Sequence, residues 1–159
     1  MISNNEFTML LKNRPDIAKL FMDFDPPKQF EDLISIKSTI SDAEYARCLR
    51  CLFQDDTQGV SIEQLRKAFE NIKKTDLMSD DEMKKYLELP DIIDIYRGTT
   101  LKENSPRLSW SLDKTIANNF YQGRMFHAKI NRDSIIAFFS EKTDEYEVIA
   151  YVNEYDLLT

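Results

Sequence analysis

Residues 134–152 read SIIAFFSEKTDEYEVIAYV, and this stretch decides the fold class that we expect. Two runs rich in β-branched and aromatic residues, SIIAFF and YEVIAYV, flank an acidic polar segment, which predicts two strands joined by a loop. Three similar runs precede them after Pro90, and one amphipathic helical stretch, residues 113–120, interrupts the series. These earlier runs are IIDIY (92–96), RLSWS (107–111) and MFHAKI (125–130). Residues 91–159 are therefore expected to form a small mixed or antiparallel β-core.

The sequence pattern of residues 1–90 predicts helices. Four serines each stand three residues before Glu or Gln, and in such a capping box the serine hydroxyl and the later side chain each bond a backbone N–H. The four pairs are Ser3 with Glu6, Ser41 with Glu44, Ser61 with Gln64 and Ser79 with Glu82. The most amphipathic helix is expected from residue 61 to about residue 74. The prediction is an α+β protein, with a helical N-terminal half packed on the β-core as one compact unit.

The charge balance limits the partners. The chain carries 21 Lys and Arg against 28 Asp and Glu, a net charge of −7. Nonspecific binding to nucleic acid or to an anionic membrane needs a basic face, so both partners are disfavoured. No apolar run approaches the roughly 20 residues that cross a bilayer. Residues 1–13 lack the basic start and small-residue cleavage site of a secretory signal, so we expect a cytoplasmic protein.

The scarce residue types limit the chemistry. Only three glycines occur, and they form neither a GxGxxG nor a Walker A phosphate loop. Cys48 and Cys51 are an isolated CxxC pair and His127 is the only histidine, so a zinc site would have to recruit carboxylates. We expect reduced core cysteines, a structural histidine and no metal.

Polar residues interrupt the strand-like runs at three places. Each has a plain interpretation: a surface arginine at a turn, a solvated edge strand, and an inert acidic loop. Each also has a functional one. A guanidinium can bind an anion, paired hydroxyls can orient a carboxylate or an amide, and paired carboxylates can divide acid–base roles or stabilise an oxocarbenium-like centre. The clusters are Arg97 with Gly98, Ser109 with Ser111, and Glu145 with Glu147.

The order of these clusters resembles the Arg-Ser-Glu class of mono-ADP-ribosyltransferases, over about residues 91–152. Residues 120–124 (FYQGR) and the following run MFHAKI are similar to the phosphate-nicotinamide loop of the clostridial Rho-modifying exoenzymes and their binary-toxin relatives. Residues 134–149 are similar to their strand, substrate-recognition loop and catalytic-glutamate strand. Trp110 stands where the family usually has Thr, and the segment from Arg97 to Ser109 is shorter, as in a compact phage-type member.

The resemblance implies a role for each residue. Glu147 would bond the 2′-hydroxyl of the nicotinamide ribose and stabilise the oxocarbenium ion as nicotinamide leaves, with Ser109 holding its carboxylate. Glu145 would align the acceptor, with arginine favoured, and help to deprotonate it. The residues binding NAD would be Arg97 and Arg124 at the pyrophosphate, Gly98 at the nicotinamide amide, Phe120 against the nicotinamide ring, and Ser109 and Ser111.

We therefore expect a mono-ADP-ribosyltransferase that uses NAD as substrate and modifies a protein target. Two alternatives stay open: a catalytically silent relative that binds and inhibits a partner protein, and an NAD glycohydrolase with water as acceptor. In the structure, Arg97, Ser109 and Glu147 should converge on one cleft, with Glu147 within hydrogen-bonding or one-water reach of Ser109.

Overall fold

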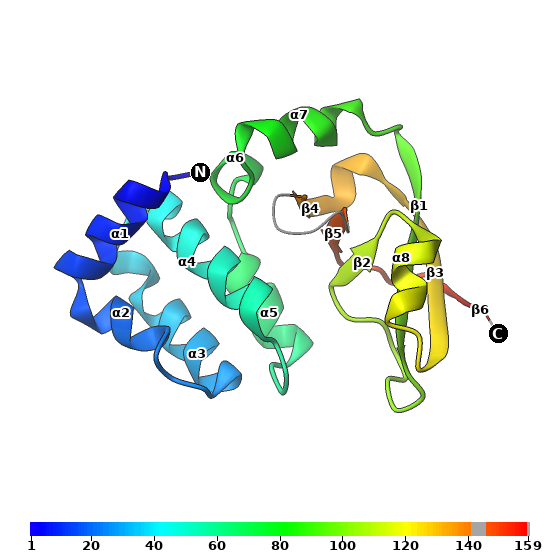
Figure 1. The fold of residues 1–159 in the computed structure, drawn as a ribbon, viewed down its shortest axis with the longest axis horizontal. Helices are drawn as coiled ribbons and strands as arrows, with labels where there is room; N and C mark the ends of the chain where they lie inside the picture. The colour runs from blue at the N-terminus through cyan, green and yellow to red at the C-terminus, as the bar shows by residue number, and fades with distance from the viewer. Residues whose placement is uncertain (141–145, 159) are drawn as a thin grey trace. The chain divides into compact units, whose positions relative to one another are not determined.

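The computed structural model describes residues 1–140 and 146–158 and confirms an α+β chain. It divides into two compact units, residues 1–79, blue to green in Figure 1, and residues 80–159, which follow from green to red. The change from helix to strand falls at Pro90, as the sequence predicts, because α7 (Asp80–Glu88) ends before it and β1 (Ile92–Thr100) begins after it. The division between the units lies earlier, because α7 contacts β4 (Ile135–Phe139).

The first unit is helical. Complete capping boxes at Ser3 and at Ser41 begin two of its helices, and the Ser61 hydroxyl accepts the backbone N–H of Gln64 at the start of a third. The helices are α1 (Asn4–Asn13), α2 (Pro15–Leu20), α3 (Pro26–Ile36), α4 (Asp42–Asp55), α5 (Ile62–Phe69) and α6 (Lys74–Leu77), with a short 3-10 turn at Lys37–Thr39. Helix α5 is shorter than predicted: it ends at Phe69, and the left-handed backbone of Asn71, with φ of 59°, interrupts the helical path.

Buried polar side chains connect the helices of this unit through backbone carbonyls. The Tyr45 hydroxyl donates to the carbonyl oxygen of Ala68 at 2.9 Å, and Arg50, only 2% exposed, donates to that of Leu77 at 2.8 Å. Each bond satisfies a carbonyl at or near the end of a helix, where the helix itself supplies no donor.

The second unit contains a six-stranded sheet in the order β4-β5-β2-β1-β3-β6, and each of its strand pairs is antiparallel. All five predicted strand runs and the predicted helix are present, whereas the sixth strand was not predicted. The remaining elements are β2 (Ser109–Ser111), α8 (Lys114–Asn119), β3 (Gly123–Asn131), a 3-10 turn (Arg132–Ser134), β5 (Glu147–Ala150) and β6 (Asp156–Leu158).

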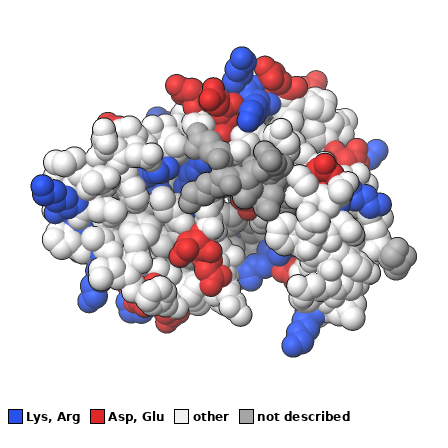
Figure 2. Space-filling model, viewed as in Figure 1, with Lys and Arg blue, Asp and Glu red and all other residues white. Residues whose placement is uncertain are grey.

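The core of this unit is apolar, with Ile95, Trp110 and Val148 each at most 2% exposed. Glu82 of α7 is fully buried, and its carboxylate accepts the backbone N–H of Ser140 at 2.8 Å, which ties the helix to the end of β4. None of the helices described is long and apolar enough to cross a membrane. On the face shown in Figure 2, the described Lys and Arg side chains are scattered among acidic and uncharged residues.

Candidate functional site

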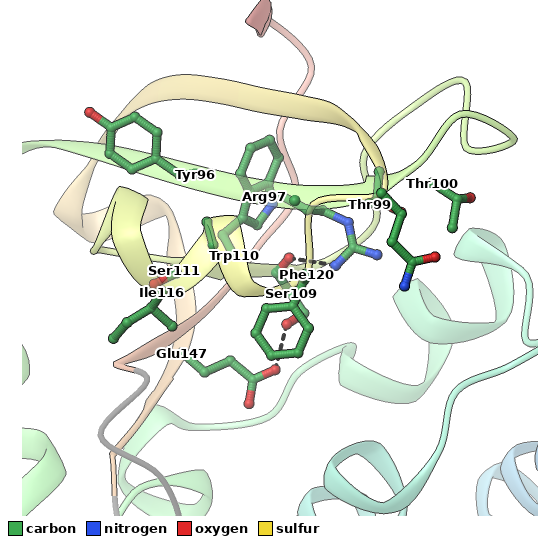
Figure 3. Close-up of a pocket in the computed structure, with 13 residues that line it drawn as sticks. Tyr96, Arg97, Thr99, Thr100, Ser109, Trp110, Ser111, Ile116, Phe120 and Glu147 are labelled. Atoms are coloured by element: carbon green, nitrogen blue, oxygen red, sulfur yellow. Dashed lines mark hydrogen bonds between the residues drawn. The ribbon is translucent and has the colours of Figure 1, made fainter. Parts of the chain in front are cut away.

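A pocket of about 330 Å³ opens where β1, β2, β5 and α8 meet (Figure 3). Its volume lies at the lower end of the range of small-molecule sites. Strand β2 lies between β1 and β5, so residues of β1 and β5, which are far apart in the sequence, meet at this point. The lining residues are Tyr96, Arg97, Gly98, Thr99, Thr100, Ser109, Trp110, Ser111, Ile116, Ala117, Phe120, Gln122 and Glu147.

A hydrogen bond between Ser109 and Glu147 is at the centre of the site. The Ser109 hydroxyl donates to Oε1 of Glu147 at 2.6 Å, a length typical of a charge-assisted bond to a carboxylate. Pairing of Ser111 with Glu147 puts Ser109, Ser111 and Glu147 on one face of the sheet, because side chains alternate along a strand. The expected contact between Ser109 and Glu147 is therefore confirmed.

Arg97 reaches the same pocket by a different route. Tyr96 pairs with Ser111, so the side chain of Arg97 leaves β1 on the face opposite to the serines. Its guanidinium nevertheless donates to the carbonyl oxygen of Ser109 at 2.9 Å, and Figure 3 draws the bonds from Ser109 to both Arg97 and Glu147. All three residues line one pocket, as expected, but the side chains of Arg97 and Glu147 leave the sheet on opposite faces, which counts against an ADP-ribosyltransferase site.

Sequence analysis missed the main partner of Arg97, which is Glu103. Nη2 of Arg97 lies 3.0 and 3.2 Å from the two oxygens of the Glu103 carboxylate, and Nε lies 3.3 Å from one of them. The side chains of both residues are 19% exposed. No motif marks Glu103 in the sequence, because the residues around it form an irregular turn.

Two further arginines accompany the turn that carries Glu103. Nη1 of Arg124 donates to the carbonyl oxygen of Glu103 and to Oδ1 of Asn104, at 3.1 Å for the latter. Arg124 itself is not among the residues that line the pocket. Burial lowers the pKa of Arg107, neighbouring Arg97 lowers it further, and Glu103 opposes both effects. Arg107 and Arg124 therefore both interact with the turn that carries Glu103.

Helix α8 closes one side of the pocket. A Cβ atom at Gly98 would lie 2.0 Å from the carbonyl oxygen of Ala117, so the close approach of this helix accounts for the glycine. The Ser111 hydroxyl accepts the backbone N–H of Asp113 and donates to its carbonyl oxygen, both at 3.1 Å, at the start of the helix. Phe120, directly after the C-terminal end of α8, is 51% exposed and lines the pocket. The expected packing of its ring on the nicotinamide ring requires such exposure.

The chain enters β5 through an unusual backbone conformation. Tyr146, directly before Glu147, has a φ of 43°, in the left-handed region that a tyrosine rarely adopts. Its ring stacks on Phe138, with centroids 6.1 Å apart. Such local strain concentrates at functional sites. Glu145, the expected acceptor-aligning residue, lies outside the described residues.

His127 and the cysteines lie apart from this chemistry. Nε2 of His127 lies 2.7 Å from Oδ1 of Asp94, and the ring stacks on Tyr96 with centroids 5.0 Å apart. Cys48 and Cys51 are free thiols, and burial raises the pKa of Cys48 to about 12. Within residues 1–140 and 146–158, no group of three or more His, Cys, Asp or Glu side chains is arranged to hold a metal ion.

Comparison with models of known protein families, with curated proteins and with solved structures gives no match. The class of site is defined by its residues: a carboxylate held by a serine hydroxyl, beside an arginine and an exposed aromatic ring.

Proposed function

We propose that this protein is an NAD-dependent mono-ADP-ribosyltransferase and that its second unit has the ADP-ribosyltransferase type of fold. The supporting observation is the 2.6 Å bond from Ser109 to Glu147, in a pocket that Arg97 also lines. A carboxylate held on paired strands is preorganised, so it stabilises positive charge that develops nearby without first reorganising.

The proposed reaction begins with cleavage of the bond between C1′ of the ribose and the nicotinamide nitrogen. The bonding electron pair leaves with nicotinamide, which becomes neutral, and positive charge spreads over C1′ and the ring oxygen. Glu147 accepts a hydrogen bond from the ribose 2′-hydroxyl and stabilises this charge, while Ser109 holds Oε1 in position. The acceptor, with an arginine side chain of a protein favoured, then attacks C1′ and loses a proton, a step assigned to Glu145.

The pocket volume suits the nicotinamide–ribose half of the dinucleotide. Phe120 is exposed enough to pack on the nicotinamide ring. The Arg97 guanidinium offers the two-pronged geometry that suits a pyrophosphate better than an ammonium does. The adenosine half extends out of the pocket.

The test is incubation of the protein with NAD labelled in its adenylate half and a bacterial lysate as the source of acceptors. We expect released nicotinamide and a labelled protein band. Nicotinamide without labelled protein would instead establish an NAD glycohydrolase. Glu145→Gln separates the two activities, because it should reduce transfer more than hydrolysis.

A catalytically silent binding protein is the second candidate, and the ion pair between Arg97 and Glu103 favours it. A pyrophosphate must compete with this carboxylate for the guanidinium. Calorimetric titration with NAD decides between the candidates: the silent binder gives neither NAD binding nor nicotinamide release.

A further inference from the structure

The contact between Arg97 and Glu103 has the geometry of a bound anion. Both oxygens of the Glu103 carboxylate lie within 3.3 Å of Nε or Nη2 of Arg97. A guanidinium binds a carboxylate and a phosphate group through the same pair of parallel N–H donors. Glu103 therefore occupies Nε and Nη2 of Arg97, the pair of donors that an anion in the forked geometry uses.

Two further arginines interact with the residues of this contact. Arg107 interacts electrostatically with both Arg97 and Glu103. Arg124 holds the same turn through the carbonyl oxygen of Glu103 and the side chain of Asn104. Arg97, Arg107 and Arg124 thus all interact with the turn that carries Glu103, and the Glu147 carboxylate lines the same pocket as Arg97. Several guanidinium groups near one turn can together bind an anion that carries more than one negative charge.

We propose that the Glu103 carboxylate is an internal substitute for the diphosphate of a ligand: it occupies Arg97 when the pocket is empty, and a diphosphate displaces it on binding. The inference rests on the proposed function in one respect: the ligand group that displaces Glu103 in the cell is then the pyrophosphate of NAD. The anion site itself requires only Arg97 and its neighbours. Glu103 then weakens the binding of every such anion, because the ligand must first break an existing ion pair.

The test is titration of the full chain with inorganic pyrophosphate at constant ionic strength. Calorimetry measures the affinity, and fluorescence gives an independent signal because Trp110, the only tryptophan, lines the pocket. Glu103→Gln should bind pyrophosphate at least about tenfold more tightly than the wild type, and Arg97→Ala in the Glu103→Gln background should remove the gain. Inorganic phosphate should show a smaller gain, since it has one phosphoryl group.

Asp91→Asn is the matched control. Asp91 is paired with Arg132 at 3.2 Å and its side chain is 91% exposed, so the variant removes the same charge and also breaks an ion pair, but away from the pocket. Its affinity for pyrophosphate should equal that of the wild type. Equal affinity of the wild type and Glu103→Gln, or an equal gain in Asp91→Asn, would overturn the proposal.

Thermal unfolding provides a second readout. Without ligand, Glu103→Gln should melt below the wild type, because the guanidinium groups lose their counter-charge, and pyrophosphate should raise its melting temperature more than that of the wild type. If Glu103→Gln does not fold, Glu103→Asp replaces it, because the shorter side chain weakens the contact with Arg97. Glu103→Asp should then bind pyrophosphate more tightly than the wild type, by a smaller factor than is expected for Glu103→Gln. An affinity of Glu103→Asp equal to that of the wild type would also overturn the proposal.

NAD cleavage by the same variants separates the two proposals. Tighter pyrophosphate binding by Glu103→Gln without NAD cleavage by any variant keeps the anion site and refutes the transferase. NAD cleavage with unchanged pyrophosphate affinity keeps the transferase and refutes the role of Glu103.

Discussion

Arg50 in the helical unit and Arg97 in the β unit show two different uses of a shielded guanidinium. Arg50 is 2% exposed and bonds the carbonyl oxygen of Leu77, a fixed partner at a helix end. Arg97 also bonds a backbone carbonyl, that of Ser109, but its Nε and Nη2 donate to the carboxylate of Glu103 on a turn beside a pocket. A carbonyl cannot be replaced without disrupting a helix or a strand, whereas a carboxylate on a turn can exchange with a ligand. The partners of an arginine, more than its burial, indicate which use applies.

The largest effect expected from this contrast concerns the β unit. Glu147→Gln removes the negative charge proposed to stabilise the developing cation, so nicotinamide release should fall by about 100- to 1000-fold. NAD affinity should stay near the wild-type value, since the proposal assigns NAD binding to Arg97. The measurement is nicotinamide release under saturating NAD, with Glu154→Gln, an exposed glutamate, as control. Wild-type turnover in Glu147→Gln would break the assignment of the site.

The two serines of β2 sharpen the comparison within the site. Ser109→Ala loses the bond to Glu147, and since bonds to charged groups contribute about 1.5–3 kcal/mol, turnover should fall by about 10- to 100-fold. Ser111→Ala instead loses the bonds to the backbone of Asp113. It should reduce the melting temperature more than the turnover of the folded protein. Equal turnover losses in the two variants would contradict this division.

In the helical unit, Arg50→Met should affect stability alone. The substitution keeps an apolar stem but leaves the carbonyl of Leu77 without its charged donor, at a cost of about 1.5–3 kcal/mol in the free energy of unfolding. Urea denaturation followed by circular dichroism measures this loss. NAD cleavage per folded molecule should match the wild type. A fall in that rate would show that the two arginines are not separable in function.

The smallest effect is expected at Cys48, which is fully buried. At pH 8 its thiol stays protonated, because burial raises its pKa to about 12, so a thiol reagent should leave it unmodified until the chain unfolds. Cys51→Ala should therefore abolish labelling of the native protein. Labelling of native Cys51→Ala at the rate of a free thiol would contradict the burial.

The same pKa shift makes a pH prediction. The unfolded thiol ionises near the ordinary value of 9.0, but the folded one only near 12. The contribution of Cys48 to stability is therefore complete below pH 9 and is lost as the pH rises from 9 toward 12. Over this window the unfolding free energy of Cys48→Ala should fall less steeply than that of the wild type.

The sequence predicted the strands better than it predicted the contacts around the site. Apolar runs and the capping serines at positions 3 and 41 act over a few residues, so local patterns reveal them. The hydrogen bond from Ser109 to Glu147 was expected only from the family resemblance. Glu103 and the positive φ of Tyr146 were missed, because the ion pair depends on how a turn lies against β1, and nothing local favours a left-handed tyrosine. The end of α5 at Phe69 was missed for a similar reason: the apolar spacing continues past the residue where the backbone turns.

The position of β2 between β1 and β5 also has a consequence for the order of folding. Ser109 and Glu147 are 38 residues apart in sequence, so their contact requires closure of a long loop, whereas each turn of a helix forms between residues only a few positions apart. During synthesis on the ribosome, Arg97 and Ser109 emerge well before the glutamate. A nascent or prematurely terminated chain that ends before residue 147 therefore carries the arginine and the serine without the carboxylate to which the reaction is assigned.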